Sequence, residues 1–168
     1  MKRKTIHKPI PERTKSKSKP LKGRGNDNLL RKVRQPSKST IKRRAWDMFS
    51  RVIRTRDCLK TTGTLERGRC ITCGDEFSFT YLQAGHFIPG RHNANLFSEK
   101  GCHSQCKRCN IWGHGKPLEY RRAIIDFYGE GYDEILEREA REIRKYSVED
   151  LIALAEEYKN KTNNLIKG

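Results

Sequence analysis

Two pairs of cysteines constrain the fold of this chain more than any other feature. Cys70 and Cys73 form one C-x2-C pair, and Cys106 and Cys109 form a second pair after 32 intervening residues. Each pair presents two thiolates from one turn, and four thiolates make the tetrahedral shell that zinc prefers. Two redox C-x-x-C pairs in one small chain without a thioredoxin-like pattern are a weaker alternative. The spacing therefore predicts a structural Zn2+ site with no open position for a substrate.

Two further cysteines, Cys58 and Cys102, lie close in sequence to these pairs. Either could in principle replace one of the four ligands. We favour the paired four, because a C-x2-C turn brings two sulfurs together locally. A reducing compartment also favours metal ligation over disulfides.

Charge is distributed very unevenly along the 168 residues, which carry a formal net charge of +17. Residues 1–50 carry +14, residues 51–125 carry +7, residues 126–157 carry −7 and residues 158–168 carry +3. Basic side chains that neutralise phosphates release condensed counterions, so this excess predicts DNA or another nucleic acid as partner. The acidic stretch would repel phosphates, so we expect it to serve as scaffold or in subunit contact.

No run of residues approaches the roughly 18 apolar residues of a spanning helix, and no long apolar segment follows the basic N-terminus as in a secretory signal. The sequence thus predicts no membrane partner and a soluble, cytoplasmic protein.

Residues 1–39 are rich in Lys, Ser and Pro and are predicted to be a disordered basic tail that binds DNA, or a solvated arm without a specific role. Residues 40–165 are predicted to form one domain.

The apolar periodicity of residues 40–165 predicts helices and short strands. Helical spacing predicts helices over residues 40–56, 133–145 and 147–159, and it places Ile143 and Ile152 on apolar faces. A loop is expected over residues 57–68. Extended segments are expected from Phe77 towards His86 and over residues 97–105, with a further helix just after Cys109. Ser147 with Asp150 predicts a capping box.

The 32 residues between the cysteine pairs are more than a plain zinc ribbon requires. A strand ending at His86, a second strand and a helix opening at Asn110 would describe a ββα unit fastened by zinc. Such a unit can place a histidine opposite a helix residue around one divalent ion. An isolated strand histidine is more often structural, but this setting favours catalysis for His86. For Asn110, capping of the following helix is the alternative.

These residues resemble the HNH-type (His-Me finger) nucleases and, more closely, the NinG (Rap) recombination proteins of lambda-like phages. The matching blocks are Ile53-Arg54-x-Arg56-Asp57, Cys70-Ile-x-Cys73-Gly74, Ala84-Gly85-His86-Phe87, His103-x-Gln105-Cys106-x-x-Cys109-Asn110, and Tyr120 followed by an apolar helix and Gly129. The resemblance covers about residues 40–165, and five blocks in order make it specific.

The resemblance implies an α+β fold with a zinc-stapled, HNH-like ββα core flanked by helices. It implies that His86 is the general base, that Asn110 binds a catalytic divalent metal, Mg2+ or Mn2+, and that His103 is a further ligand or orients His86. The implied function is endonuclease cleavage of branched recombination DNA, such as Holliday junctions and D-loops. Symmetric cutting of a junction would favour a homodimer.

Two glycines depart from the HNH pattern. Gly85 stands where an Asp commonly precedes the general base, although NinG-like proteins share this glycine. Gly101 stands where the middle Asn is expected, so Asn93 or Asn95 would substitute for it, or His86 is oriented in another way. Both departures favour an alternative, a non-catalytic zinc-containing DNA-binding recombination mediator. A general HNH nicking endonuclease is the other alternative.

Several further side chains of the same region could contact DNA. Phosphate contacts are expected from basic side chains around the ββα unit, namely Arg91, Lys107, Arg108 and Lys116. His92 and His114 are expected to contact phosphate or to be solvated. Trp112 is expected in the core rather than stacked on an unpaired base.

Overall fold

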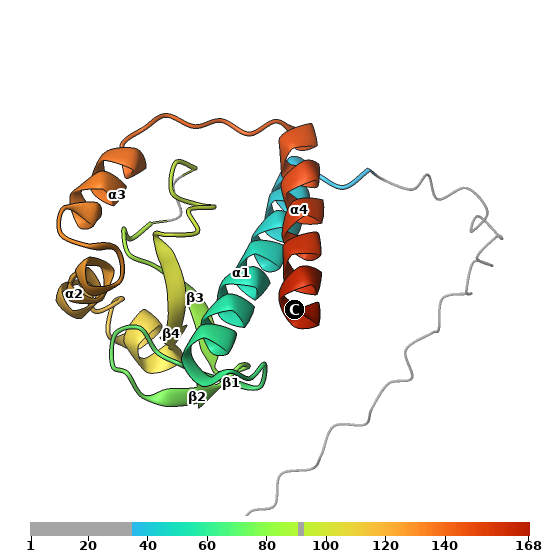
Figure 1. Cartoon of the computed structure of the whole chain (residues 1–168). Coiled ribbons are helices and arrows are strands. Elements are labelled where there is room, and N and C mark those ends of the chain that lie inside the picture. Colours follow the sequence, from blue (N-terminus) through green and yellow to red (C-terminus); the bar gives the residue numbers. More distant parts are fainter. Residues whose placement is uncertain (1–34, 91–92) are drawn as a thin grey trace, which may run out of the picture. The chain divides into compact units, whose positions relative to one another are not determined.

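The part of the chain that the structure describes, residues 35–90 and 93–168 of a computed structural model, alternates between helices and short strands (Figure 1). The elements are α1 (Lys38–Thr62), β1 (Arg67–Arg69), β2 (Glu76–Ser78), β3 (Leu82–His86), β4 (Cys102–Cys106), the π-helix η2 (Arg108–Trp112), α2 (Pro117–Tyr128), α3 (Tyr132–Ala140) and α4 (Val148–Lys167). The mixed α and β fold class is confirmed. Residues 1–34 of the predicted tail lie outside the described residues.

Helix α1 is longer than the sequence predicts. The Ser37 side chain accepts a hydrogen bond from Thr40 N and caps its first turn. The helix continues through Asp57 and Cys58, both buried, and ends at Gly63, which adopts a left-handed φ of 71°. The prediction of a loop over residues 57–68 is therefore wrong for its first half, because the helix buries Asp57 and Cys58 and continues to Thr62.

Two strands, β2 and β3, replace the single strand that was expected from Phe77 towards His86, and they belong to two separate antiparallel hairpins. Strand β1 pairs with β2, and β3 pairs with β4. A turn closed by a hydrogen bond from Tyr81 N to Ser78 O separates β2 from β3. The register of the second hairpin places Gly85 opposite His103 and His86 opposite Cys102. Because side chains alternate along a strand, His86 and His103 point to opposite faces.

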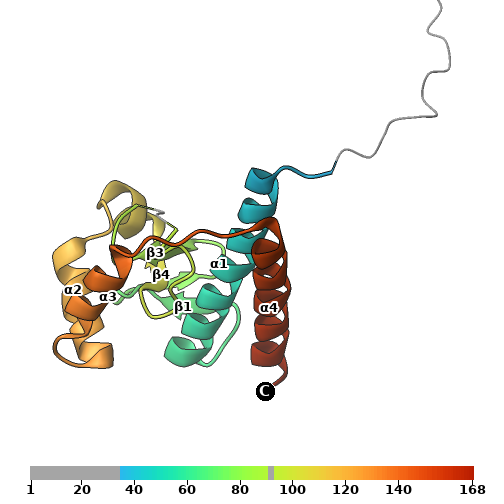
Figure 2. The same ribbon diagram turned by 90° about the horizontal axis from the view of Figure 1, so that it is seen from above.

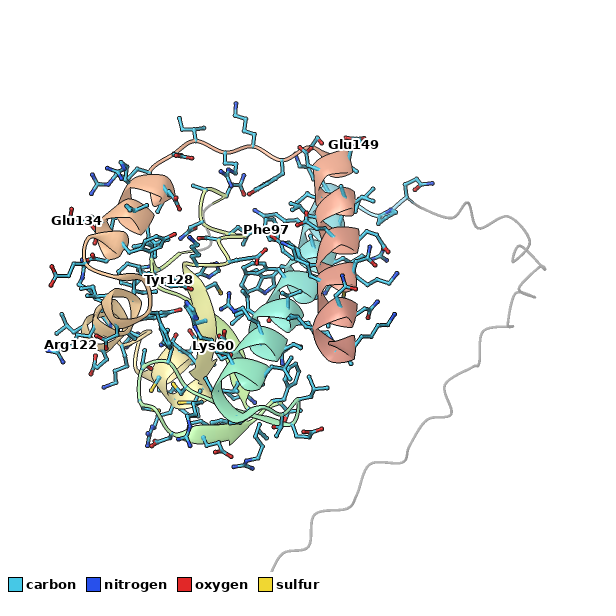
Figure 3. All side chains as sticks on the ribbon, in the orientation of Figure 1. Lys60, Phe97, Arg122, Tyr128, Glu134 and Glu149 are labelled. Carbon is cyan, nitrogen blue, oxygen red and sulfur yellow. The ribbon has the colours of Figure 1, made fainter. Side chains whose placement is uncertain are left out.

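The β3–β4 hairpin lies between two pairs of helices (Figures 1 and 2). Helices α1 and α4 run side by side on one side, and α2 and α3 cover the other. Three aromatic rings cluster in the first interface: Phe49 of α1, Tyr158 of α4, and Phe97 of the loop between β3 and β4. Phe97 is labelled in Figure 3. The second interface buries Phe87, Tyr120, Ile124 and Leu136. Both faces of the hairpin are thereby covered by helices.

The C-terminal helices differ from their predicted bounds. Helix α3 ends at Ala140, so Ile143 lies outside it and is 90% exposed, contrary to its predicted place on an apolar face. The capping box of Ser147 and Asp150 is confirmed, and α4 continues to Lys167. Ile152 is also exposed, because only one narrow face of α4, with Leu151 and Tyr158, packs on α1. Among the described residues, no helix is long and apolar enough to cross a membrane.

Candidate functional site

Four cysteines meet at one end of the β3–β4 hairpin. The Sγ atoms of Cys70, Cys73, Cys106 and Cys109 all lie within 4.8 Å of one another. Tetrahedral zinc with Zn–S bonds of about 2.3 Å requires sulfurs about 3.8 Å apart, so the cluster fits a closed four-thiolate shell. The predicted ligand set is thus brought together, and it can hold a structural metal such as zinc.

Local structure closes the turns that carry these sulfurs and affects the ionisation of their thiols. Gly74, with a φ of 74°, closes the first turn by donating its N–H to Cys70 O. Burial opposes ionisation of Cys70, but hydrogen bonds from Thr72 and from backbone N–H groups lower the pKa of its thiol to about 7. Cys109 N donates to Cys106 Sγ in the second turn. Hydrogen bonds of this kind favour the thiolate form that binds metal, whereas burial raises the pKa of the Cys73 and Cys106 thiols.

Cys58 and Cys102 lie outside the cluster. Both are fully buried, and Cys102 belongs to the core between α1 and α4. Burial raises the pKa of the Cys58 thiol to about 11. The preference for the paired four as the candidate ligands is therefore consistent with the geometry.

A cleft beside the cysteine cluster brings His86 and Asn110 together. It has a volume of about 390 Å3. Its walls come from the end of β3 and the following loop, from η2 and from the loop before α2, and its lining residues are Ala84, His86, Phe87, Pro89, Gly90, Asn110, Ile111, His114, Gly115 and Pro117. The cleft thus joins a strand imidazole to a helix amide, as the sequence predicted.

The imidazole of His86 is held from two directions. Its Nε2 lies 3.2 Å from Leu96 O, and its ring stacks on Trp46 of α1 with ring centroids 5.2 Å apart. Because a carbonyl oxygen accepts hydrogen bonds, this contact requires a proton on Nε2. Asn95 supports this arrangement, since its Nδ2 donates to Ile88 O within the loop that carries Leu96.

One buried and one half-buried contact fix the strand and the amide around this imidazole. Tyr120 of α2 is fully buried, and its hydroxyl donates to Gly85 O over 2.8 Å. Asn110 Nδ2 donates to Gln83 Oε1 over 2.8 Å. Helix α2 and strand β3 therefore position the two groups that the cleft brings together.

The structure does not bring His103 into this cleft. Its ring is buried on the opposite face of the hairpin, where Nδ1 lies 3.1 Å from Arg56 Nη2 and 3.5 Å from Asp57 Oδ2. Its Nε2 lies 3.1 Å from the Tyr128 hydroxyl. This ring borders a separate cavity of about 220 Å3. His103 is therefore placed in a polar network that links α1, β4 and α2.

The exposed side chains around the cleft differ from the prediction in one respect. Trp112 is 70% exposed, so its predicted burial in the core is wrong. The π-helix turn of η2 directs it outward next to Arg108 and Lys116, with which it lines a shallow cavity. Arg108 also pairs with Asp75 over 3.2 Å. The predicted contacts of Arg91 and His92 lie outside the described residues.

Sequence reasoning missed the contribution of α1 to the site. Trp46 belongs to the helical periodicity of α1 and carries no local signal that it would stack on His86. It also missed Gln105, which is fully buried and whose Nε2 donates to Gly115 O over 2.8 Å. The resemblance contained Gln105, Arg56 and Asp57 as matching residues but gave them no role.

Fold and site together define a small α+β protein with four clustered cysteines that could hold a metal, beside a histidine-bearing cleft. A family model described as Bacteriophage Lambda NinG protein matches residues 1–167 of the chain. The chain belongs to the NinG family. No curated protein and no solved structure gave a match. The predicted resemblance to NinG is confirmed.

Proposed function

We propose that this protein is a metal-dependent DNA endonuclease of phage recombination, which hydrolyses phosphodiester bonds in branched DNA such as Holliday junctions and D-loops. The observation that carries the proposal is the cleft shared by His86 and Asn110. Membership of the NinG family supports a role in phage recombination. The order of β3, β4 and η2 supports an HNH-like ββα core in which η2 takes the place of the helix.

In the proposed mechanism His86 is the general base. Its Nε2–H donates to Leu96 O, and we assign Nδ1 as the atom that accepts the proton of a water molecule attacking the phosphorus. The stacked Trp46 ring restricts rotation of the imidazole and excludes water from one of its faces. Holding the base in one orientation lowers the entropic cost of reaching the reactive geometry.

Asn110 would hold the catalytic divalent metal, Mg2+ or Mn2+, through its amide oxygen. Such an ion, when bound, stabilises negative charge on the phosphate and on the leaving oxygen. The four cysteines hold a structural Zn2+ and take no part in the chemistry. We assign His103 to positioning, because its ring contacts Arg56 and Tyr128 on the other face of the hairpin.

The test is cleavage of a four-way junction with Mg2+ by the His86→Ala variant. We expect cleavage to fall at least 100-fold, the size typical for loss of a general base. Zinc content and junction binding should remain near wild type. Added imidazole should restore part of the activity, a rescue that a merely structural histidine would not show. Full retention of cleavage would sink the assignment.

One observation favours a second candidate, a non-catalytic zinc-containing DNA-binding recombination mediator. The described residues that line the cleft include no Asp or Glu, whereas HNH enzymes commonly carry a carboxylate there. Gel-shift assays of junction and duplex DNA separate the two, since shifts without Mg2+-dependent products would support the mediator.

Product sizes on junction and linear DNA distinguish junction cleavage from general nicking. Sedimentation of the junction complex tests the proposed homodimer.

A further inference from the structure

A buried oxygen of Gln105 lies over Gly85 without a hydrogen-bond partner among the described residues. Gln105 is 0% exposed. Its Nε2 donates to Gly115 O over 2.8 Å and to Thr72 Oγ1 over 3.3 Å. These two acceptors fix the orientation of the amide, so Oε1 is directed away from them and towards Gly85. A buried acceptor without a donor is costly, which points to a partner that the chain does not supply.

A second amide oxygen is directed into the same space. Asn110 Nδ2 is bound to Gln83 Oε1, which leaves Asn110 Oδ1 on the side of Gly85. A Cβ atom at position 85 would lie 2.1 Å from Gln105 Oε1 and 3.1 Å from Asn110 Oδ1. The two oxygens therefore converge on the space that a side chain of residue 85 would fill. Glycine is required there, because any Cβ would collide with Gln105.

The chemistry of this pair fits a hard divalent cation. Amide oxygens are ligands for Mg2+, Mn2+ and Ca2+, whereas the thiolates of the neighbouring cluster suit zinc. Both oxygens are neutral, so the charge of the ion would remain available to a phosphate group. Asn110 also borders the cleft that contains His86, so its side chain connects this pair of oxygens with that cleft.

We propose that Gln105 Oε1 and Asn110 Oδ1 are protein ligands of one divalent cation of the Mg2+ or Mn2+ class. Gln105 supplies a ligand oxygen from β4. Residue 85 of β3 cannot supply one, because it is a glycine. The role of this ion in DNA cleavage rests on the proposed function, whereas its binding is a separate property of the folded chain. Without a carboxylate ligand, the ion is held weakly until a phosphate oxygen joins its shell.

The experiment is a titration of the zinc-loaded full chain with Mn2+, followed by NMR of assigned side-chain amide groups. Paramagnetic Mn2+ should broaden the amide signals of Gln105 and Asn110 at lower concentrations than those of amides on α4. In Gln105→Ala, broadening of Asn110 should require at least tenfold more Mn2+. Asn163→Ala, which removes an exposed amide of α4, should respond as the wild type does.

A second variant keeps the test decisive if Gln105→Ala is poorly folded. The double variant Gly85→Asp, Gln105→Ala removes the ligand oxygen of Gln105 from β4 and adds a carboxylate oxygen on β3. It also removes the collision between a side chain at position 85 and Gln105. This double variant should bind Mn2+ at least as tightly as the wild type, whereas Gly85→Asp alone should be destabilised. Equal Mn2+ responses of the wild type and Gln105→Ala would overturn the proposal. So would a double variant with full zinc content and no Mn2+ response.

The outcomes for the cation and for the nuclease are separable. If Mn2+ broadens both amides and His86→Ala retains cleavage, the cation site stands and the proposed general base fails. If His86→Ala abolishes Mg2+-dependent cleavage and neither amide responds to Mn2+, the nuclease stands and the Gln105 site is overturned.

Discussion

At the scale of single residues, the carboxylate of Asp57 connects α1 to β4. Its Oδ2 accepts from Ser104 N over 2.6 Å, and its Oδ1 accepts from Arg56 Nε over 2.7 Å. Burial alone would raise the pKa of Asp57, but contacts with His103 and Arg56 hold it below its ordinary value of 3.8. A carboxylate with a depressed pKa stabilises the fold above the unfolded value, and this stability is lost as pH falls through the folded value.

Asp57→Asn should therefore destabilise the protein by about 3 kcal/mol at pH 7, because Arg56 would remain buried without its partner. Urea unfolding measures the difference. In the wild type, the carbon resonance of the Asp57 carboxyl group should show it ionised at every pH above 4. A carboxyl group that titrates above pH 4 would contradict the assigned network.

At the scale of secondary-structure elements, the bounds of a helix were predictable only where the residues that set them lie close together in the sequence. Ser147 and Asp150 form a cap within four residues, so the start of α4 was predictable. The bounds of α1 were not, because Asp57 and Cys58 are buried only by contacts with distant strands. The π-helix turn of η2 was also missed, since the cysteine cluster rather than apolar periodicity shapes it. Trp112 was therefore misplaced, while the cysteine set and the placement of His86 and Asn110 along one cleft were predicted.

Ser147→Ala should lower the stability of the protein by about 1 kcal/mol, since it removes the acceptor of Asp150 N at the start of α4. Chemical denaturation followed by circular dichroism measures this change. Ser147→Thr keeps the hydroxyl group and serves as the control, with an expected loss below about 0.5 kcal/mol. Equal losses for both variants would argue against the cap as the cause.

At the scale of the whole molecule, the four-cysteine cluster joins segments distant in sequence. Cys70 follows β1, whereas Cys106 ends β4 and Cys109 lies in η2. Strand β4 packs against α1, pairs with β3 and borders the cavity at His103, so the metal would hold together the framework of the cleft as well as its own turns.

Removal of the metal by a strong chelator should unfold this framework, since structural zinc contributes on the order of 10 kcal/mol in small domains. Metal analysis should find one zinc per chain, and circular dichroism should show loss of helix on chelation. Cys109→Ser should behave like the chelated protein, and Cys58→Ser should retain its zinc. Unchanged spectra after complete removal of zinc would contradict this role.

The basic N-terminal region belongs to the same scale. Residues 1–34 contain 13 Lys and Arg, and deleting them leaves the Ser37 cap of α1 in place. The deletion should weaken binding to all DNA structures and make the salt dependence shallower, by roughly 0.9 in logarithmic slope for each DNA phosphate that the shortened chain no longer neutralises. Binding measured between 50 and 200 mM salt tests this, and an unchanged slope would show that the region does not bind DNA.

The side-by-side packing of α1 and α4 has a consequence for biosynthesis. Phe49 and Tyr158 share one core although more than a hundred residues separate them along the chain. Until α4 has left the ribosome, the part of the apolar face of α1 that packs on α4 is uncovered, and that helix carries the Trp46 that stacks on His86. Chains that terminate before α4 would therefore expose this apolar face and should be substrates for proteases.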